Sequence, residues 1–424
     1  MTIFKTLLTT VAISALASTS ALAQTLVIKT QKLVTNQQLG VVENGTILIE
    51  DGRIKAIGTN ADYQADKIIQ GETVWVTPGI FAVYSHLGLV EVSAEASTND
   101  INASDADAGL SLRASDSFNP HASNVAVSRL GGITHAAVVP DAGSTIFGGI
   151  GMVVSTNGSL DTDPTPRFIY VELGQAGANT AGGSRSAALG YLRSALEDVA
   201  NPNRYKDGAH DGDVLSRYEA SILRRAVRGE IPLMIGADRA ADIVNIIKLK
   251  KGRMKIIIIG AAEGWMVADR LAAANISVVI DPIENLPYSF DALGTRPDNA
   301  KLLREAGVDM AIMTRRVTGA GAHNLRLLTQ HAGNAVANGL SWDEAFKAIT
   351  LAPATMMGMP SLGRLQAGQP ANLVVWNGDP LEVTSSVVAV IIDGKVQDLT
   401  SRQTQLRDRY HPTRTDKPAY GYRP

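Results

Sequence analysis

Residues 231–282, IPLMIGADRAADIVNIIKLKKGRMKIIIIGAAEGWMVADRLAAANISVVIDP, decide the fold class of this chain. Three apolar runs in this segment, IPLMIGAD, MKIIIIGA and ISVVIDP, are separated by two stretches with a helical pattern, at 240–250 and 264–274. Near-continuous runs of Val and Ile that alternate with helices are typical of parallel strands buried on both faces by βα units. The segment therefore predicts an α/β fold with a parallel sheet.

The same pattern continues on both sides of this segment. Further strand-like runs are GIFAVYSH at 79–86, ITHAAVVP at 133–140, RFIYVELG at 167–174 and VDMAIMT at 308–314, with an eighth strand expected within IFGGIGMVVST at 146–156. Helical patterns also occur at 184–199, 215–228, 300–305 and 324–338. Eight such strands favour a (β/α)8 TIM barrel over residues 80–359, and an open doubly wound sheet is the alternative.

The two ends of the chain have an all-β pattern instead. GTILIEDGRIKAIG, at 45–58, and SSVVAVIIDGKVQDL, at 385–399, each contain Asp-Gly between apolar runs, which is a strong signal for a β-hairpin. We therefore expect residues 24–79 and 360–400 to form the two halves of a composite β-sandwich domain. Residues 401–424 are expected to be a basic tail.

The N-terminus has the pattern of a secretory signal peptide. It reads MTIFKTLLTTVAISALASTSALAQ, with Lys5 ahead of an apolar run at 7–16 and an A-x-A cleavage site that ends at Ala23. The apolar run is shorter than the about 20 residues that a membrane-spanning helix needs. We therefore expect residues 1–23 to be removed and the mature protein to be periplasmic and soluble. An uncleaved amphipathic anchor is the alternative.

The composition limits the partners and the chemistry. The 424-residue chain has 39 Lys and Arg against 41 Asp and Glu, for a formal net charge of -2. Nothing in this balance indicates a nucleic acid or an anionic membrane surface as partner, so we expect a small-molecule ligand. The chain has no Cys, which excludes disulfides, thiolate metal sites and a Cys nucleophile.

Two motifs resemble those of a known superfamily. VTPGIFAVYSHLGLVEV, at 76–92, resembles the first barrel strand of the amidohydrolase superfamily, whose usual form is Pro-Gly, two apolar residues and Asp-Ala-His-x-His. LAPATMMGMPSLGRLQAGQPANLVVWNGDP, at 351–380, resembles the superfamily's closing stretch, with its Gly-x-Leu-x-x-Gly turn. Within the superfamily the chain looks most like the imidazolonepropionase-like proteins, which hydrolyse C–N bonds in cyclic amides and related substrates.

The resemblance implies a metal centre at the mouth of the barrel, where the strands end. Amidohydrolases use one or two divalent metals to turn water into hydroxide and to polarise the scissile carbonyl. A His-x-His pair suits this role because residues two apart on a strand point to the same side. Here Tyr84 stands at the first His position, His86 stands at the second, and Ala82 replaces the preceding Asp. A phenol with a pKa near 10 is a poor substitute for imidazole.

Other implied ligand positions have also changed. Glu172 stands where the fourth strand usually carries a Lys or Glu, and it is a candidate ligand for a metal or a small molecule. Gly236 and Gly260 stand where the fifth and sixth strands carry His, so they offer no side chain. Asp238 is expected to be the N-cap of the helix that begins near Ala240, a role that Asp fills readily.

The eighth strand should end in an Asp that acts as ligand and general base, but it offers Thr314, Arg315 and Arg316. Positive charge there repels a divalent cation and attracts an anion, so Arg315 is a candidate contact for a carboxylate or phosphate. A surface salt bridge is the alternative. A catalytic zinc usually has three protein ligands, and only His86 and Glu172 remain. The sequence therefore predicts a vestigial metal site without a tightly bound cofactor.

Neither the remaining histidines nor the long loop at 88–118 is expected to supply the missing metal ligands. We expect an ordinary structural role for each of the other six histidines, His121, His135, His210, His323, His331 and His411. Residues 88–118, rich in Ser, Ala and Asp, are expected to form a long loop over the mouth, with a solvated acidic loop as the alternative. The sequence leaves open whether Asp100, Asp105 or Asp107 reach the mouth.

The leading hypothesis is a barrel of amidohydrolase ancestry that has little or no catalytic activity. Such a protein would bind a small molecule through Tyr84, His86, Glu172 and Arg315, or would assist an active relative. The main alternative is a working C–N hydrolase with one zinc or other divalent ion held by His86, Glu172 and a third ligand. A purely structural interaction protein, with a mouth plugged by side chains, is the third reading. Homo-oligomerisation and pairing with an active relative are both open.

Overall fold

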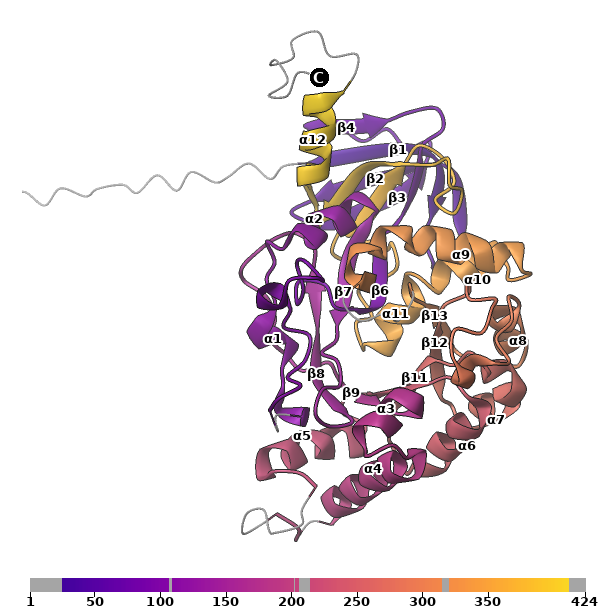
Figure 1. Ribbon diagram of the computed structural model, residues 1–424. Coiled ribbons are helices and arrows are strands. Elements are labelled where there is room, and N and C mark those ends of the chain that lie inside the picture. Colours follow the sequence, from indigo (N-terminus) through magenta and orange to yellow (C-terminus); the bar gives the residue numbers. More distant parts are fainter. Residues whose placement is uncertain (1–24, 107–108, 202, 206–213, 315–319, 412–424) are drawn as a thin grey trace, which may run out of the picture.

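A computed structural model describes residues 25–106, 109–201, 203–205, 214–314 and 320–411. Two eight-stranded sheets organise this part of the chain. Figure 1 shows one sheet at the top, where the indigo N-terminal strands and the yellow C-terminal strands lie together, and the barrel with its surrounding helices below. Among the described residues, every helix is too short or too polar to cross a membrane.

The upper sheet is built from both ends of the chain. Its strand order is β16-β15-β14-β5-β1-β2-β3, and β4 pairs with β1. The antiparallel pairing of β5 with β14 joins the two ends. The strands are β1 (Leu26–Val34), β2 (Val41–Glu50), β3 (Arg53–Thr59), β4 (Lys67–Gln70), β5 (Trp75–Pro78), β14 (Leu373–Trp376), β15 (Val387–Ile392) and β16 (Lys395–Val396). The predicted sandwich form of this domain, and the predicted domain boundaries, stay predictions.

Both predicted hairpins are present, and their turns touch. Asp51 and Gly52 have φ values of 51° and 78°, and Asp393 and Gly394 have φ values of 48° and 75°. Two consecutive residues with positive φ are the mark of a type I′ turn, for which Asp-Gly is well suited. A Cβ at Gly394 would lie 2.3 Å from Gly52 Cα. Glycine at these positions therefore lets the two halves of the domain pack turn against turn.

The second sheet is a nearly closed barrel with the order β13-β12-β11-β10-β9-β8-β7-β6. Seven of its eight strands take part in the parallel pairing that the sequence predicted, β6 with β7 and β9 through β13 in succession. The strands are β6 (Ile80–Ser85), β7 (Ile133–Val138), β8 (Phe147–Ser155), β9 (Phe168–Glu172), β10 (Leu233–Ala237), β11 (Ile256–Gly260), β12 (Ser277–Ile280) and β13 (Met310–Ile312).

Strand β8 departs from the predicted (β/α)8 pattern. It lies in the barrel as expected, but it is antiparallel to both β7 and β9. Residues 139–146 alone connect β7 to β8, and a parallel crossover needs a dozen or more residues. The prediction of a regular (β/α)8 barrel is therefore wrong at this strand, because a short connection turns the chain back on itself.

The predicted helices are present with ends shifted by a few residues. Helix α5 begins with a capping box in which Ser216 and Glu219 satisfy each other's backbone N–H groups. The helices around the barrel are α4 (Arg185–Ala200), α5 (Arg217–Val227), α6 (Ala240–Leu249), α7 (Ala268–Ala273), α8 (Asn299–Glu305), α9 (Leu328–Ala337), α10 (Trp342–Lys347) and α11 (Leu351–Met356). The shorter or peripheral helices are α1 (Ala114–Ser117), α2 (Ser123–Leu130), α3 (Gly174–Thr180) and α12 (Arg402–Tyr410). Single 3-10 turns are η1 (Ala96–Thr98), η2 (Gly109–Ser111), η3 (Gly264–Val267), η4 (Phe290–Ala292), η5 (Ala320–His323) and η6 (Leu325–Leu327).

Strand alternation divides the core into two layers. On β9, Phe168 and Tyr170 belong to the cluster inside the barrel, whereas Ile169 and Val171 pack with the outer helical layer. Because side chains two apart on a strand share a face, Glu172 continues the inward row of Phe168 and Tyr170. The side chain of Glu172, the last residue of β9, therefore points to the mouth of the barrel.

The described part of the loop at 88–118 contains η1, η2 and α1. Ile101 and Leu110 are buried, and the amide of Asp141, which follows β7, donates to the carbonyl of Ile101 at 2.7 Å. Asp100 and Asp105 are exposed, and Asp107 lies outside the described residues. The loop thus packs through its apolar residues and directs Asp100 and Asp105 to the solvent.

Candidate functional site

Two of the predicted site residues lie side by side where β6 ends. The ring centroids of Tyr84 and His86 are 5.7 Å apart, with an angle of 57° between the planes. Both side chains are buried, Tyr84 at 6% exposure and His86 at 3%. The spacing of two residues places them on one side of the chain, as the sequence predicted.

Glu172 joins this pair through Tyr170, which the sequence reasoning did not single out. The Tyr170 hydroxyl donates a hydrogen bond of 2.5 Å to Glu172 Oε2. The ring of Tyr170 meets the ring of Tyr84 edge-on, with centroids 5.8 Å apart. Tyr84, His86, Tyr170 and Glu172 therefore form one buried group, which we call the mouth cluster. Tyr170 could have been found from the same two-residue spacing that links Tyr84 to His86.

The mouth cluster presents His86 as a neutral imidazole at neutral pH. Burial lowers the pKa of His86 below its ordinary value, and the charge of Asp141 opposes this shift in part. The proton is disfavoured because a buried site solvates the charged ring poorly. Asp141 follows β7, and its position next to the cluster was not predicted. Neutral imidazole can accept or donate a hydrogen bond and can bind a metal.

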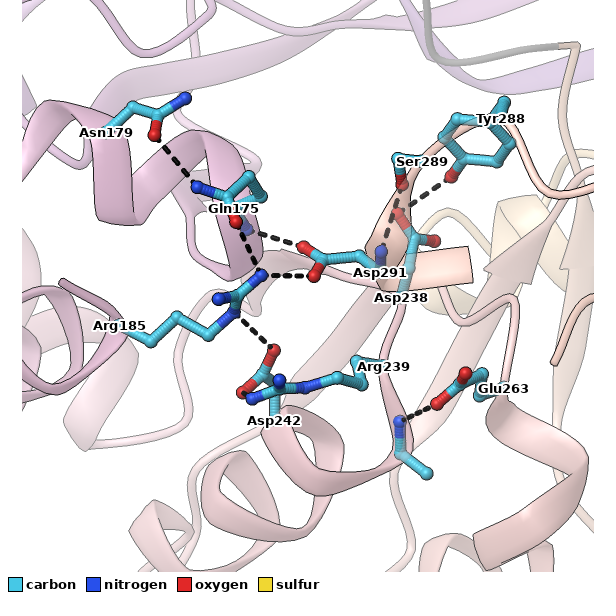
Figure 2. Close-up of polar contacts among 11 residues, drawn as sticks. Gln175, Asn179, Arg185, Asp238, Arg239, Asp242, Glu263, Tyr288, Ser289 and Asp291 are labelled. Carbon is cyan, nitrogen blue, oxygen red and sulfur yellow. Dashed lines mark hydrogen bonds and ion pairs between the residues drawn. The ribbon is translucent and has the colours of Figure 1, made fainter. Parts of the chain in front are cut away.

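The end of β11 leaves little room for a side chain at position 260. Gly260, at the end of β11, has φ of +105°. A Cβ built there would lie 2.2 Å from Asp238 Oδ1, far inside van der Waals contact. Asp238 is buried and accepts a hydrogen bond of 2.8 Å from the Tyr288 hydroxyl, as Figure 2 shows. The carboxylate of Asp238 thus occupies the space that a side chain at position 260 would need.

The predicted capping role of Asp238 is wrong. The N-cap of α6 is Arg239, which makes no side-chain capping bond. Glu263 supplies the missing acceptor, because its Oε2 accepts from the Ala240 amide at 2.9 Å while its Oε1 accepts from the Gly294 amide at 3.0 Å. A tertiary contact with Tyr288 therefore outweighs the local capping preference of Asp238.

Arg185 ties together the segments that follow β9, β10 and β12 (Figure 2). Its guanidinium pairs with Asp291 and donates to Gln175 Oε1 at 2.7 Å. Its Nε lies 3.4 Å from Asp242 Oδ2. The backbone N–H of Gln175 donates to Asp291 Oδ2 at 2.6 Å. We call this group of four residues the rim network. None of its residues was a predicted site residue.

A buried pair of His331 and Asp281 lies near the end of β12, and the predicted arginines follow β13 in the sequence. His331 Nδ1, in α9, lies 2.8 Å from Asp281 Oδ1, just after β12, and both side chains are buried. This contact anchors α9 to the barrel and agrees with a structural role for His331. Thr314 is buried at the end of β13, but Arg315 and Arg316 lie outside the described residues.

The donor set at the mouth does not fit the metal centre that the resemblance implies. In the described ranges, no three His, Cys, Asp or Glu side chains come close enough together to hold a metal ion. Glu172 is engaged by the Tyr170 hydroxyl, and the place of a ligand from β11 is filled by Asp238. The described residues at the mouth therefore do not supply the three protein ligands usual for a catalytic zinc.

Comparison with known proteins agrees with the barrel and its closing motif. The model described as "Amidohydrolase family" matches residues 250–397, from the end of α6 to β16. This match and the relatives described next support the assignment of the chain to the amidohydrolase superfamily. Over 395 residues it is 25% identical to the imidazolonepropionase of Paracoccus denitrificans (strain Pd 1222), covering 81% of this chain and 91% of that protein.

Two further comparisons add a second curated relative and a solved structure with the same fold. It is 23% identical to the amidohydrolase tasK of Hapsidospora irregularis over 395 residues, which are 83% of this chain but only 40% of that relative's length. The crystal structure of an amidohydrolase from Thermotoga maritima MSB8 has the same fold, with a TM-score of 0.77 and 22% identity. That comparison covers 88% of this chain and 99% of the other.

Proposed function

We propose that this amidohydrolase-superfamily protein binds a small molecule at the mouth of its barrel and hydrolyses C–N bonds weakly or not at all. The observation that carries the proposal is that a Cβ built at Gly260 would lie 2.2 Å from Asp238 Oδ1. The space for a metal-binding side chain on β11 is therefore taken by the Asp238 carboxylate. A simple return of histidine at position 260 would have to displace a buried carboxylate.

The shortage of metal ligands is the second support. In this superfamily a bound metal lowers the pKa of its water to about 7, which makes hydroxide available at neutral pH. His86 and Glu172 are the two candidate ligands at the mouth, and zinc enzymes usually use three. A lone general base typically contributes about 10²- to 10⁴-fold, so Glu172 alone would not replace the metal.

The chemistry of the mouth cluster suggests the ligand. The Tyr84 ring, which keeps 6% exposure, offers an aromatic surface for a planar group, and the Glu172 carboxylate accepts N–H donors. A small planar molecule with an amide N–H, such as a cyclic amide, meets both demands. Arg315, outside the described residues, is the candidate contact for an anionic group on that ligand. The relative named imidazolonepropionase is consistent with a ligand of this class.

An active hydrolase with a single divalent metal is the second candidate. It is favoured by one observation, the lowered pKa of His86, because the neutral ring is the form that binds zinc. This alternative requires a third ligand beyond His86 and Glu172. Homo-oligomerisation and pairing with an active relative stay predictions.

Turnover assays separate the two candidates. The purified mature protein would be assayed on hydantoins, imidazolones and dipeptides, with and without added zinc or manganese, beside His86→Ala and Glu172→Gln. We expect turnover near background in every case, and binding of at least one cyclic amide that weakens at least tenfold in Glu172→Gln. Metal-stimulated turnover that is lost in His86→Ala would contradict the proposal and favour the single-metal hydrolase.

Export to the periplasm is part of the proposal and rests on the signal-peptide pattern alone. Residues 1–23 lie outside the described residues. Mass spectrometry of the periplasmic fraction should find Gln24, in free or cyclised form, as the first residue. Recovery of a form that begins at Met1 in the membrane fraction would contradict this.

A further inference from the structure

A large cavity lies at the opposite end of the barrel from the mouth cluster. Its volume is about 1050 Å³, comparable to that of small-molecule sites. It is lined by the segments that lead into β9, β10, β11, β12 and β13 and by α11. The mouth cluster lies instead where the strands end. We call the cavity the N-terminal cavity because it lies at the N-terminal ends of strands β9 to β13. It therefore has no part in the function proposed above.

The N-terminal cavity is strongly basic. Eight Lys or Arg side chains line it against three acidic ones, Glu230, Asp309 and Glu344. The cavity thus has an excess of five positive charges in a chain whose formal net charge is -2. Several of the cations are already neutralised. Arg225 and Arg228 pair with Glu230, and Arg304 pairs with Asp309 and Glu344. Arg167 and Lys347 pair with Asp163 and Asp343, which lie outside the lining.

Arg253 and Lys255 remain available. In the part of the chain that the structure describes, both are exposed and neither has an ion-pair partner. Basic residues are common at helix C-termini, where they complement the helix dipole. Arg253 and Lys255 do not fit that explanation, because they follow α6 by several residues and directly precede β11 at Ile256. In the described part of the chain neither charge takes part in an ion pair, and both residues line the cavity.

The wall behind these charges is apolar and adaptable. Met254, between Arg253 and Lys255, is 4% exposed and lines the cavity together with Met310, Met356 and Met357. Methionine is flexible and polarizable, so it fits apolar groups of varied shape. The cavity thus combines free positive charge at its edge with a methionine-lined interior.

We propose that the N-terminal cavity is a second binding site, which takes a small amphipathic carboxylate. The carboxylate pairs with Arg253 and Lys255, since charge-assisted hydrogen bonds to Arg and Lys are the strong ones. The apolar body of the ligand covers the methionine wall and is removed from water. A cationic amphiphile of the same length is repelled by the excess positive charge.

Calorimetric titration at low salt tests this proposal with decanoate and decyltrimethylammonium as matched probes. We expect decanoate to bind at least tenfold more tightly than the cation. The Arg253→Glu/Lys255→Glu variant should bind decanoate at least tenfold more weakly, with an unchanged melting temperature because both side chains are exposed. Equal affinity for the two probes, or unchanged decanoate affinity in the variant, would overturn the proposal.

A charge-matched control separates a local effect from the net charge of the protein. Lys67→Glu/Lys395→Glu makes the same change in charge on the upper sheet, at two exposed positions in β4 and β16. This control should bind decanoate like the wild type. A diazirine derivative of decanoate locates the site independently, because photolabelling should mark peptides that contain Met254 or Met356. Labelling of peptides at the mouth instead would refute the assignment.

Discussion

Asp238 Oδ1 lies 2.2 Å from the point where a Cβ at Gly260 would stand. The two residues come from the ends of neighbouring strands, β10 and β11, where relatives of this chain are expected to hold a metal with histidines. Here one strand end offers a buried carboxylate that is engaged by Tyr288, and the other offers only backbone. This pair leaves no room for a side chain at position 260 unless Asp238 moves.

The first prediction concerns the space at Gly260. Gly260→Ala should lower the free energy of unfolding by about 2–4 kcal/mol, because the residue has φ of +105° and the added methyl group overlaps a buried carboxylate. Gly252→Ala is the control, since Gly252 has φ of +54° with open space around its Cβ. It should cost only the backbone strain, about 1 kcal/mol. Urea denaturation measures both.

A double mutant identifies Asp238 as the obstacle. In an Asp238→Ala background, Gly260→Ala should cost about 1–3 kcal/mol less than in the wild type, since the clashing oxygen is gone. Equal costs in the two backgrounds would show that backbone strain alone explains the glycine.

The second prediction concerns the hydrogen bond between Tyr170 and Glu172. Tyr170→Phe removes the donor but keeps the ring, and it leaves the buried carboxylate with one partner fewer. We expect a loss of about 1–3 kcal/mol in the free energy of unfolding. Tyr191→Phe, at a residue of α4 that is 51% exposed, should change stability by less than about 0.5 kcal/mol. A similarly small effect of Tyr170→Phe would contradict the role given to this bond.

The third prediction concerns pH. Burial lowers the pKa of His135 to about 4, opposed in part by the charge of Asp393. Between pH 6.5 and about 4 the unfolded chain therefore takes up a proton at His135 that the folded protein does not. Stability should fall as the pH falls through this window, by up to about 3 kcal/mol from this residue.

Variants isolate that contribution. In His135→Gln the difference in unfolding free energy between pH 7 and pH 4.5 should be smaller than in the wild type. His121→Gln, at an exposed position, should keep the wild-type slope. Parallel slopes for wild type and His135→Gln would show that the buried ring is not responsible.

The fourth prediction concerns the rim network. Phe290 is 86% exposed and directly precedes Asp291, which Arg185 and the Gln175 amide hold in place. Native chymotrypsin digestion after Phe290 should be slow in the wild type and at least severalfold faster in Arg185→Gln, because cleavage needs local opening. Arg193→Gln, also in α4 but outside the network, should be cleaved like the wild type. Equal cleavage rates for all three proteins would exclude a restraining role for Arg185.

Much of the fold could be read from the sequence because its signals are local. Runs of Val and Ile predicted the barrel strands, and Asp51-Gly52 and Asp393-Gly394 predicted the hairpin turns now seen with positive φ. The antiparallel direction of β8 could not be predicted from its apolar run, since such a run is the same for parallel and antiparallel strands. The short connection at 139–146 was the available signal.

The candidate site was predictable only in part. Tyr84, His86 and Glu172 were singled out through the resemblance to the superfamily's strand motifs, and Tyr170 would have followed from the two-residue spacing to Glu172. Asp238 accepts a hydrogen bond from Tyr288, which is 50 residues away in the sequence. No local sequence pattern predicts a contact over this separation. Asp238 was therefore assigned to a cap by its local preference, while a tertiary hydrogen bond decides its position.

Metal content tests the central claim most directly. The mature protein would be purified without chelators and analysed for zinc, manganese, iron and nickel, then titrated with zinc by calorimetry beside His86→Ala. The account predicts well below one equivalent of bound metal and no tight zinc binding that depends on His86. Near-stoichiometric metal in the wild type that is lost in His86→Ala would contradict it.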